Sequence, residues 1–352
     1  MTLQHAFDSI KPLDRRAMER AQARLDSLTK PLGSLGRLEE LVVRIAGING
    51  EAMPKVDKKT VIVMCADNGV TAEGVSSCPK SVTASVAHNF TRGITGINAL
   101  SKHAGADIVI VDIGVDADIE NAGILNKKIA KGTQNMAEGP AMTREEALRA
   151  IETGLEITEQ LARRGTNLLG TGEMGIGNTT TSSAIAAVLT GKPLELLVGR
   201  GSGLTKEGLD KKRAVIGRAI GLNRPEPQDP LDVLSKLGGF DIAGLTGCFL
   251  GAAALRIPIV VDGFISSVAA LLAARLAPLS AGFMIPSHGS AEPGSAAVME
   301  ALGFRPMLDL EMRLGEGTGA ALQFLIIDAA FAAYERMGTF GDAEIEQYKP
   351  LE

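Results

Sequence analysis

Hydrophobic and polar positions follow two alternating patterns along the chain. Apolar, largely β-branched runs predict buried parallel strands at residues 60–67, 106–112, 167–170, 258–262 and 281–285. Between these runs, apolar residues recur at helical spacing over residues 82–103, 143–163, 180–190, 206–221, 230–237, 266–277 and 291–302. Strands that alternate with helices predict an α/β core with a parallel sheet. In such a sheet, ligands bind beyond the carboxyl ends of the strands.

The two ends of the chain carry helical patterns only. Residues 11–50 predict a helical hairpin whose second helix starts near Ser34, where a serine and two following glutamates are typical of a helix start. A last apolar helix is expected at about 320–337. We therefore expect a small helical domain built from residues 1–55 and 320–352, beside an α/β domain of residues 56–319.

Composition adds an excess of glycine to this picture. The chain has 41 glycines among 352 residues, above the usual share of about 7%, and they have no triplet period. Such glycines are typical of tight turns and ligand-binding loops. The aromatic residues are ten Phe and two Tyr, without Trp, which argues against stacking platforms for single-stranded nucleic acid.

Charge and cysteine usage exclude several other classes of protein. The net charge is −5 and no long basic run occurs, so capture of nucleic acid or of an anionic membrane is not expected. The first residues lack the apolar segment of a signal peptide, and no apolar run is long enough to cross a bilayer. Three scattered cysteines indicate neither a disulfide framework nor a zinc site: Cys65, Cys78 and Cys248. We expect a cytoplasmic protein.

The densest glycine segment follows the predicted strand at 167–170. Residues 170–183 read GTGEMGIGNTTTSS, and a helix that opens on three threonines after such a loop suits a phosphate group. A tight turn with ordinary threonine capping is the alternative. The segment also matches a dinucleotide fingerprint, which keeps an NAD-dependent oxidoreductase open. However, the acidic residue that this fingerprint requires would have to be Glu195, in a loop after Pro193.

Two further glycine segments offer partners for an anion. Residues 198–204 precede a helix with Lys211, Lys212 and Arg213, which either binds phosphate or forms a solvated helix face. In residues 286–294, Ser290 and nearby N–H groups suit a second wall of an anion site. We interpret His288 in the same segment as a polar loop residue.

A glutamate flanked by glycines is the candidate general base. Glu316 lies between Gly315 and Gly317, just before the last apolar helix. Partial desolvation there would raise the pKa of its carboxyl group and suit it to proton removal, although an N-terminal cap of the helix explains the position equally well. The four histidines share no metal-ligand spacing, and we expect no metal and no cofactor.

Five motifs together resemble the nicotinate-nucleotide:dimethylbenzimidazole phosphoribosyltransferases, which make the α-ribotide of the lower ligand of cobalamin. The resemblance extends from about residue 10 to residue 340, in the order of the family. The motifs are KPLGSLGRLE from residue 30, ADNGV with EGVS from residues 66 and 73, GEMGIGNTT from residue 172, SHGSAE from residue 287 and GEGTG from residue 315.

The resemblance implies a fold and a reaction. The fold is a doubly wound, Rossmann-like parallel sheet with a small helical domain from both termini, in a homodimer. The phosphoribosyl group of nicotinate mononucleotide passes to a nitrogen of the acceptor with inversion, and nicotinate leaves. Glu316 occupies the position of the catalytic base, and Glu173 that of a second functional glutamate. Positions that hold or surround the substrate are Gly175, Gly177, Asn178, Thr179, Gly201, Lys212, Asp262, Ser290 and Gly317.

The acceptor loop departs from the family pattern. Ser85 stands where a glutamine is common, and Cys78 stands where a larger, often aromatic residue is usual, whereas Ser76 matches the family. Both changes enlarge or depolarise the acceptor pocket, so dimethylbenzimidazole, a purine and a phenol all stay open as acceptors. A heterodimer, with this chain as a non-catalytic subunit of a heteromeric phosphoribosyltransferase, is a further alternative.

Overall fold

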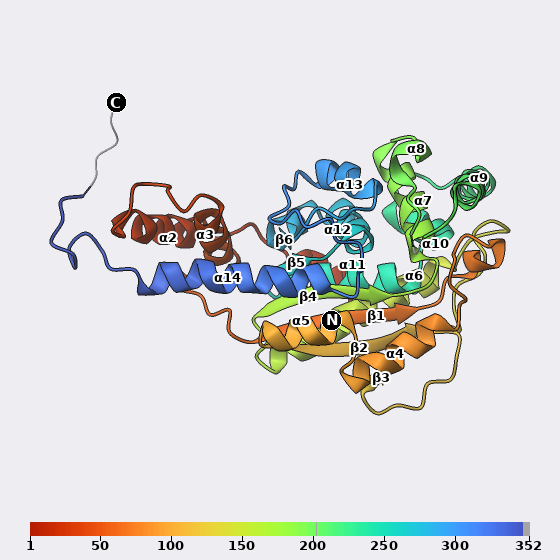
Figure 1. Ribbon diagram of the computed structural model, residues 1–352, viewed down its shortest axis with the longest axis horizontal. Coiled ribbons are helices and arrows are strands. Elements are labelled where there is room, and N and C mark those ends of the chain that lie inside the picture. The colour runs from red at the N-terminus through yellow and green to blue at the C-terminus, as the bar shows by residue number, and fades with distance from the viewer. Residues whose placement is uncertain (202, 348–352) are drawn as a thin grey trace.

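The protein is built on one six-stranded parallel sheet with helices on both faces (Figure 1). The computed structural model describes residues 1–201 and 203–347. The strand order is β3-β2-β1-β4-β5-β6, so the direction of winding reverses between β1 and β4. This is the doubly wound arrangement expected from the sequence, and its ligands bind at that reversal point. The strands are β1 (Lys59–Ala66), β2 (Ala106–Gly114), β3 (Ile124–Asn126), β4 (Leu168–Met174), β5 (Ile259–Val261) and β6 (Met284–Pro286).

Helices form the rest of the regular structure. The first half of the chain contains α1 (Leu3–Ser9), α2 (Arg15–Ser27), α3 (Arg37–Asn49), η1 (Gly69–Glu73), α4 (Val82–Arg92), α5 (Gly96–His103) and α6 (Arg144–Arg163). The second half contains α7 (Asn178–Thr190), α8 (Leu194–Leu197), α9 (Lys206–Asn223), α10 (Pro230–Leu237), α11 (Phe240–Ala254), α12 (Phe264–Leu276), η2 (Pro278–Phe283), α13 (Gly294–Leu302) and α14 (Thr318–Arg336). None of the described helices is both long and apolar enough to span a lipid bilayer.

The central strand β1 separates two hydrophobic cores. Val61, Val63 and Cys65 face the core that contains residues of α3, α4, α5 and α14. Ile62 and Met64 alternate with them and face the core that contains residues of α6, α11 and α12. Because β1 is buried on both faces, its sequence is a continuous apolar run, and this run is what predicts the strand.

Helix α14 joins the sheet to the helices at one end of the molecule. Near its start, Ala320 and Phe324 pack against Gly170 of β4, and near its end the Tyr334 hydroxyl donates to the Ala52 carbonyl over 2.7 Å. Helices α2 and α3 lie beside this far part of α14 (Figure 1). Helix α1 packs instead against α6 and α11. The division into residues 1–55 plus 320–352 and residues 56–319 stays a prediction, and residues 348–352 lie outside the described part.

Three differences from the predicted elements have simple causes. The helix predicted at 82–103 is two helices, because the chain turns at Gly93 with a φ of 73°. Helix α11 was not predicted, because a helix that is buried and apolar all round has no amphipathic period. The strand predicted at 281–285 is mainly η2, followed by the short strand β6.

Some of the excess glycine serves helix packing rather than ligand loops. A Cβ at Gly247 of α11 would lie 1.9 Å from the Ile151 carbonyl oxygen, and one at Gly154 of α6 would lie 2.0 Å from the Gly244 carbonyl oxygen. Any larger residue at these positions would force α6 and α11 apart.

Candidate active site

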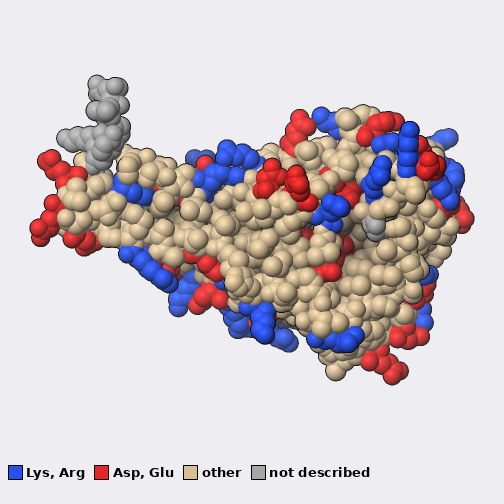
Figure 2. All heavy atoms as spheres, in the orientation of Figure 1, with Lys and Arg blue, Asp and Glu red and all other residues tan. Residues whose placement is uncertain are grey.

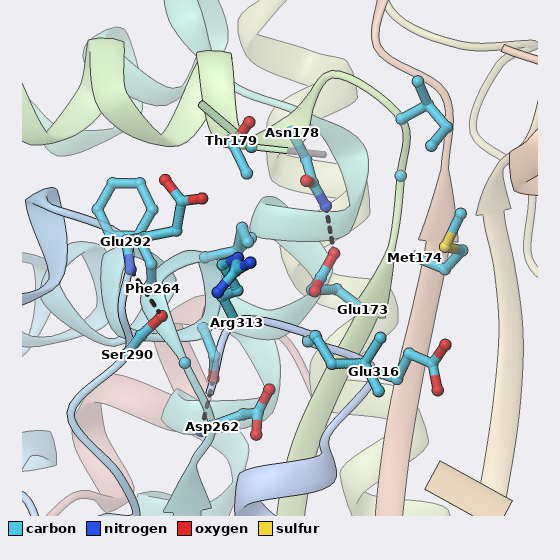
Figure 3. A pocket seen from close by; sticks show the side chains of 18 of the residues that line it. Glu173, Met174, Asn178, Thr179, Asp262, Phe264, Ser290, Glu292, Arg313 and Glu316 are labelled. Atoms are coloured by element: carbon cyan, nitrogen blue, oxygen red, sulfur yellow. Dashed lines mark hydrogen bonds between the residues drawn. The ribbon is translucent and has the colours of Figure 1, made fainter. Parts of the chain in front are cut away.

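A cavity of about 330 Å³ lies beyond the carboxyl ends of β4 and β5, near the point where the winding of the sheet reverses. Its wall is formed by the segment from β4 into α7, the segment after β5, and the loops before α13 and α14 (Figure 3). Figure 2 shows this face of the molecule hollowed to the right of centre, with acidic side chains inside the hollow and basic side chains above it. The position is the one that a doubly wound sheet predicts for its ligand.

The start of α7 forms part of the cavity wall. Strand β4 ends at Met174, and Gly177 precedes α7 with a φ of 94°, a left-handed conformation that favours glycine. No described side chain caps this helix start, and Thr179 of its first turn lines the cavity. A helix start of this kind attracts an anion.

Glu316 lies in a left-handed turn at the edge of the cavity. Gly315, Glu316 and Gly317 have φ values of 80°, 63° and 95°, and this conformation is strained for the glutamate. Its Oε2 accepts the N–H of Ile97 over 3.1 Å. Burial raises the pKa of Glu316, while the N–H groups of Ile97 and Gly96 oppose the rise. The direction agrees with the sequence-based expectation. The Glu316 side chain does not cap α14, whose N-cap is Gly317, but it accepts N–H groups at the start of α5, so a capping role stays beside that of a base.

Glu173 lies next to this turn and is nearly buried. A Cβ at Gly315 would lie 2.4 Å from Glu173 Oε1, so the turn rests directly against the Glu173 carboxyl group. The Asn178 amide donates to Glu173 Oε2, as drawn in Figure 3. Burial, and next the charge of Asp241, raise the pKa of Glu173 to about 8. This carboxyl group is therefore mainly protonated at neutral pH.

Asp262 holds the turn that carries Glu316. One of its carboxylate oxygens accepts the N–H groups of Gly319 and Ala320, at 2.7 and 3.1 Å, and the other accepts the Gly317 N–H at 3.3 Å. Burial raises the pKa of Asp262, and His288 opposes this effect. Asp262 lines the cavity, but both of its oxygens already bind the backbone at the start of α14.

Lys212 lies beneath the glycine-rich wall and only 1% of it is exposed. Its Nζ donates to Thr179 Oγ1 over 2.8 Å and to the Gly199 carbonyl over 3.3 Å. Burial lowers the pKa of Lys212 to about 8. The sequence left open whether this lysine belongs to a solvated helix face, and its burial behind Thr179 excludes that alternative.

Known proteins are similar to this chain over its whole length. A family profile described as phosphoribosyltransferase matches residues 10–345. Proteins named nicotinate-nucleotide–dimethylbenzimidazole phosphoribosyltransferase from Ruminiclostridium cellulolyticum and Clostridium acetobutylicum are 63% and 62% identical, and each alignment covers 100% of both chains. The crystal structure of CobT from Thermus thermophilus has a TM-score of 0.90 at 40% identity, covering 95% of this chain and 100% of that one.

The chain belongs to the nicotinate-nucleotide–dimethylbenzimidazole phosphoribosyltransferase family.

Most residues expected at the site of this phosphoribosyltransferase family member lie around one cavity. Those that line it are Ser76, Glu173, Gly175, Gly177, Asn178, Thr179, Gly201, Asp262, Ser290 and Glu316. Lys212 and Gly317 lie directly behind this wall. Ser85 lies outside it, because Ser85 is exposed on α4 and its hydroxyl donates to the Ser81 carbonyl over 3.1 Å. The α4 residue that reaches the cavity is Val86.

Sequence reasoning missed several residues of the site. Phe264, Glu292, Arg200 and Arg313 line the cavity although none was singled out. Of these, Arg200 and Glu292 had a signal, since they lie in the glycine-rich segments 198–204 and 286–294, and Arg313 lies two residues before the GEGTG motif. His288, expected to be an ordinary polar loop residue, is only 2% exposed and also lines the cavity.

Proposed function

We propose that this protein transfers the phosphoribosyl group of nicotinate mononucleotide to an aromatic acceptor, dimethylbenzimidazole or a related base or phenol. The products are an α-ribotide and nicotinate. The names of its relatives support the two substrates. The observation that carries the assignment in this chain is Glu316, a half-buried carboxylate of raised pKa, held by backbone N–H groups at the edge of the cavity.

The phosphate of the nucleotide fits the wall at the start of α7. In the first turn of that helix the N–H groups of Asn178 and Thr180 donate to the carbonyls of Gly175 and Gly177, which leaves the Thr179 N–H and the helix dipole to attract an anion. The Lys212 ammonium behind Thr179 supplies a positive charge in a place with little water. Ser290, on the opposite loop, lines the same cavity and is a further donor. These groups orient the nucleotide with its ribose towards Glu173.

The reaction needs one bond to form, one to break and one proton to move. A lone pair of an acceptor ring nitrogen, or of the oxygen of a phenol acceptor, attacks the anomeric carbon, and the bond to nicotinate breaks with its electrons passing to the pyridine nitrogen. Attack from the opposite side inverts the anomeric carbon. The pyridinium is already a good leaving group, so the protein's main task is to remove the N–H or O–H proton of the acceptor. Glu316 takes this proton, while neutral Glu173 donates a hydrogen bond towards the ribose and nicotinate.

The alternative functions have little support in the fold. Gly170 and Gly172 lie inside β4 rather than in a turn after it, so they do not form the phosphate-binding turn of a dinucleotide fingerprint. Glu195, which would have to bind the ribose, is exposed in α8. A non-catalytic subunit is not favoured either, because both Glu173 and Glu316 line the cavity.

We further propose that the protein is a homodimer in the cytoplasm, with a heterodimer as the alternative. Buried free thiols at Cys65 and Cys248 suit a reducing compartment. Light scattering coupled to size-exclusion chromatography gives the mass of the particle formed by this chain alone. The mass of two chains supports a homodimer, whereas the mass of one chain contradicts it.

The test of the function is incubation of the protein with nicotinate mononucleotide and a mixture of dimethylbenzimidazole, adenine, phenol and p-cresol. Mass spectrometry ranks the ribotides that form, and a reaction without acceptors is the control. We expect nicotinate release together with the ribotide of at least one acceptor. If no acceptor yields a ribotide and no nicotinate is released, the assignment is wrong.

A further inference from the structure

One basic side chain of the cavity has no partner within the protein. Arg313 lines the cavity, and among the residues that the structure describes it has no hydrogen-bond or ion-pair partner. Its backbone is nevertheless held on both sides. The Ala291 N–H donates to the Met312 carbonyl over 2.9 Å, and Gly315 lies directly against the Glu173 carboxyl group. Figure 3 shows the Arg313 side chain between the loop before α13 and Glu173, where its guanidinium group can bind a ligand.

The other side chains at this end of the cavity are acidic. Three carboxyl groups line it, those of Glu173, Asp262 and Glu316, and Glu316 follows Arg313 by three residues in the same loop. Asp262 accepts three backbone N–H groups, as an ionised carboxylate does, and Glu316 has to be ionised to act as a base. Like charges repel, so an anionic group of a ligand needs a cation to face it here.

The remaining basic groups around the cavity belong to other places. Among the described residues that line it, the basic ones are Arg200, His288 and Arg313. Arg200 precedes Gly201, where an added Cβ would lie 3.6 Å from the Lys212 Nζ, so it lies on the side of the phosphate wall. His288 is only 2% exposed, and its Nδ1 shares a hydrogen bond with the neighbouring serine. Arg313 is therefore the cation that can meet an anion near the candidate base.

We propose that Arg313 binds the carboxylate of the nicotinate ring and makes the enzyme prefer nicotinate mononucleotide to nicotinamide mononucleotide. This inference rests on the proposed function. The nucleotide has two anionic groups, and its phosphate fits the wall formed by α7 and Lys212. The ring carboxylate is then left for the other end of the cavity, beside Glu173 and Glu316. A guanidinium group donates two parallel hydrogen bonds to a carboxylate, whereas an uncharged carboxamide offers one acceptor oxygen and no charge.

Two other roles for Arg313 make different predictions. Its side chain is exposed, and an arginine that only faces solvent would affect the binding of neither nucleotide. An arginine that binds the phosphate would affect both nucleotides equally, because they share the phosphate. Only contact with the ring carboxylate changes the preference between the two. The ratio of the two dissociation constants therefore separates these three roles.

The experiment measures the Kd of each nucleotide by calorimetry, without an acceptor, in the wild type and in Arg313→Met. We expect this variant to weaken nicotinate mononucleotide binding roughly 10-fold, the lower range for a lost hydrogen bond to a charged group, because water surrounds the side chain. Binding of nicotinamide mononucleotide should change much less. Arg305→Met is the matched control, since Arg305 is exposed in the same segment between α13 and α14 but lies outside the cavity. We expect it to leave both Kd values unchanged.

Three results would overturn the proposal: equal weakening of both nucleotides in Arg313→Met, no weakening of either, or a wild type without preference for the carboxylate. We expect Arg313→Lys, which keeps the charge but loses the paired donors, to have a Kd between those of the wild type and Arg313→Met. Failure of the wild type to bind nicotinate mononucleotide or to form a ribotide would refute the proposed function instead. A wild type that forms ribotide, with an Arg313→Met variant of unchanged preference, would refute only the role of Arg313.

Discussion

The carboxylate of Glu316 accepts a hydrogen bond from the backbone N–H of Ile97, 3.1 Å away, in the first turn of α5. The two residues are 219 positions apart in the sequence, and they meet because α14, which follows Glu316, packs against α5. The candidate base is therefore fixed from both sides, by its own left-handed turn and by the start of another helix. Such fixation suits a group that must meet a proton in one direction.

With Glu316 as the proposed base, this contact predicts how the reaction depends on pH. Burial raises the pKa of Glu316 and the Ile97 N–H opposes the rise, so removal of that N–H raises the pKa further. We expect Ile97→Pro to move the acidic limb of the kcat/KM profile to higher pH, because the base is active only when ionised. Ile97→Ala is the control, since it loses the same packing but keeps the N–H. A limb at the same pH in both variants would contradict this role.

Lys212 gives a prediction on substrate affinity. We expect Lys212→Met to raise the KM for nicotinate mononucleotide about 10- to 100-fold, the range for a lost hydrogen bond to a charged group, with a smaller change in kcat. Lys211→Met is the matched control, because Lys211 is the exposed neighbour on the same helix. In the wild type, the pKa of about 8 for Lys212 predicts a rising KM as the pH passes 8 and the positive charge is lost. Steady-state kinetics of both variants check this, and equal KM values would remove Lys212 from the phosphate site.

Glu173 makes the stability of the protein depend on pH. Its pKa is about 8 when folded and near the usual 4.5 when unfolded, so the folded state binds the proton more tightly. The free energy of unfolding therefore falls as the pH rises from about 4.5 to about 8. Glu173→Gln has no such proton to lose. We expect its melting temperature, relative to wild type, to be higher at pH 9 than at pH 5, and a pH-independent difference would contradict the raised pKa.

Gly319 allows the close packing that supports the Glu316 turn. A Cβ there would lie 1.9 Å from His288 Nδ1 and 2.9 Å from Asp262 Oδ1. We expect Gly319→Ala to lower the free energy of unfolding by about 1–3 kcal/mol, as overpacking does, and to reduce activity by shifting the turn. Gly221→Ala, in α9 with no atom within 4 Å of the added Cβ, should not destabilise the protein. Urea unfolding compares the two, and equal stabilities would disprove the packing argument.

Sequence patterns predicted β1, β2, β4 and β5 and most of the helices, because a long apolar strand or an amphipathic helix leaves a local signal. The three-residue strand β3 (Ile124–Asn126) left none and was not predicted. The site was predictable where the motif itself carries the chemistry, as at Glu316 with its two glycines. The sequence could not decide whether Lys212 binds phosphate or lies on a solvated helix face, because its burial behind Thr179 depends on how α9 packs against α7. Asp241 had no local signal at all, since only the fold brings it to Glu173.

The most direct test of the central claim compares kcat/KM for phosphoribosyl transfer in Glu316→Gln and Glu311→Gln. Both glutamates have positive φ values, 63° and 54°, but Glu311 is exposed and lies outside the cavity. We predict that Glu316→Gln loses roughly 100- to 10,000-fold of the rate, as expected for a general base, while its Kd for nicotinate mononucleotide and the activity of Glu311→Gln stay near wild type. A Glu316→Gln enzyme within a few-fold of the wild-type rate would contradict the assignment of Glu316 as the base.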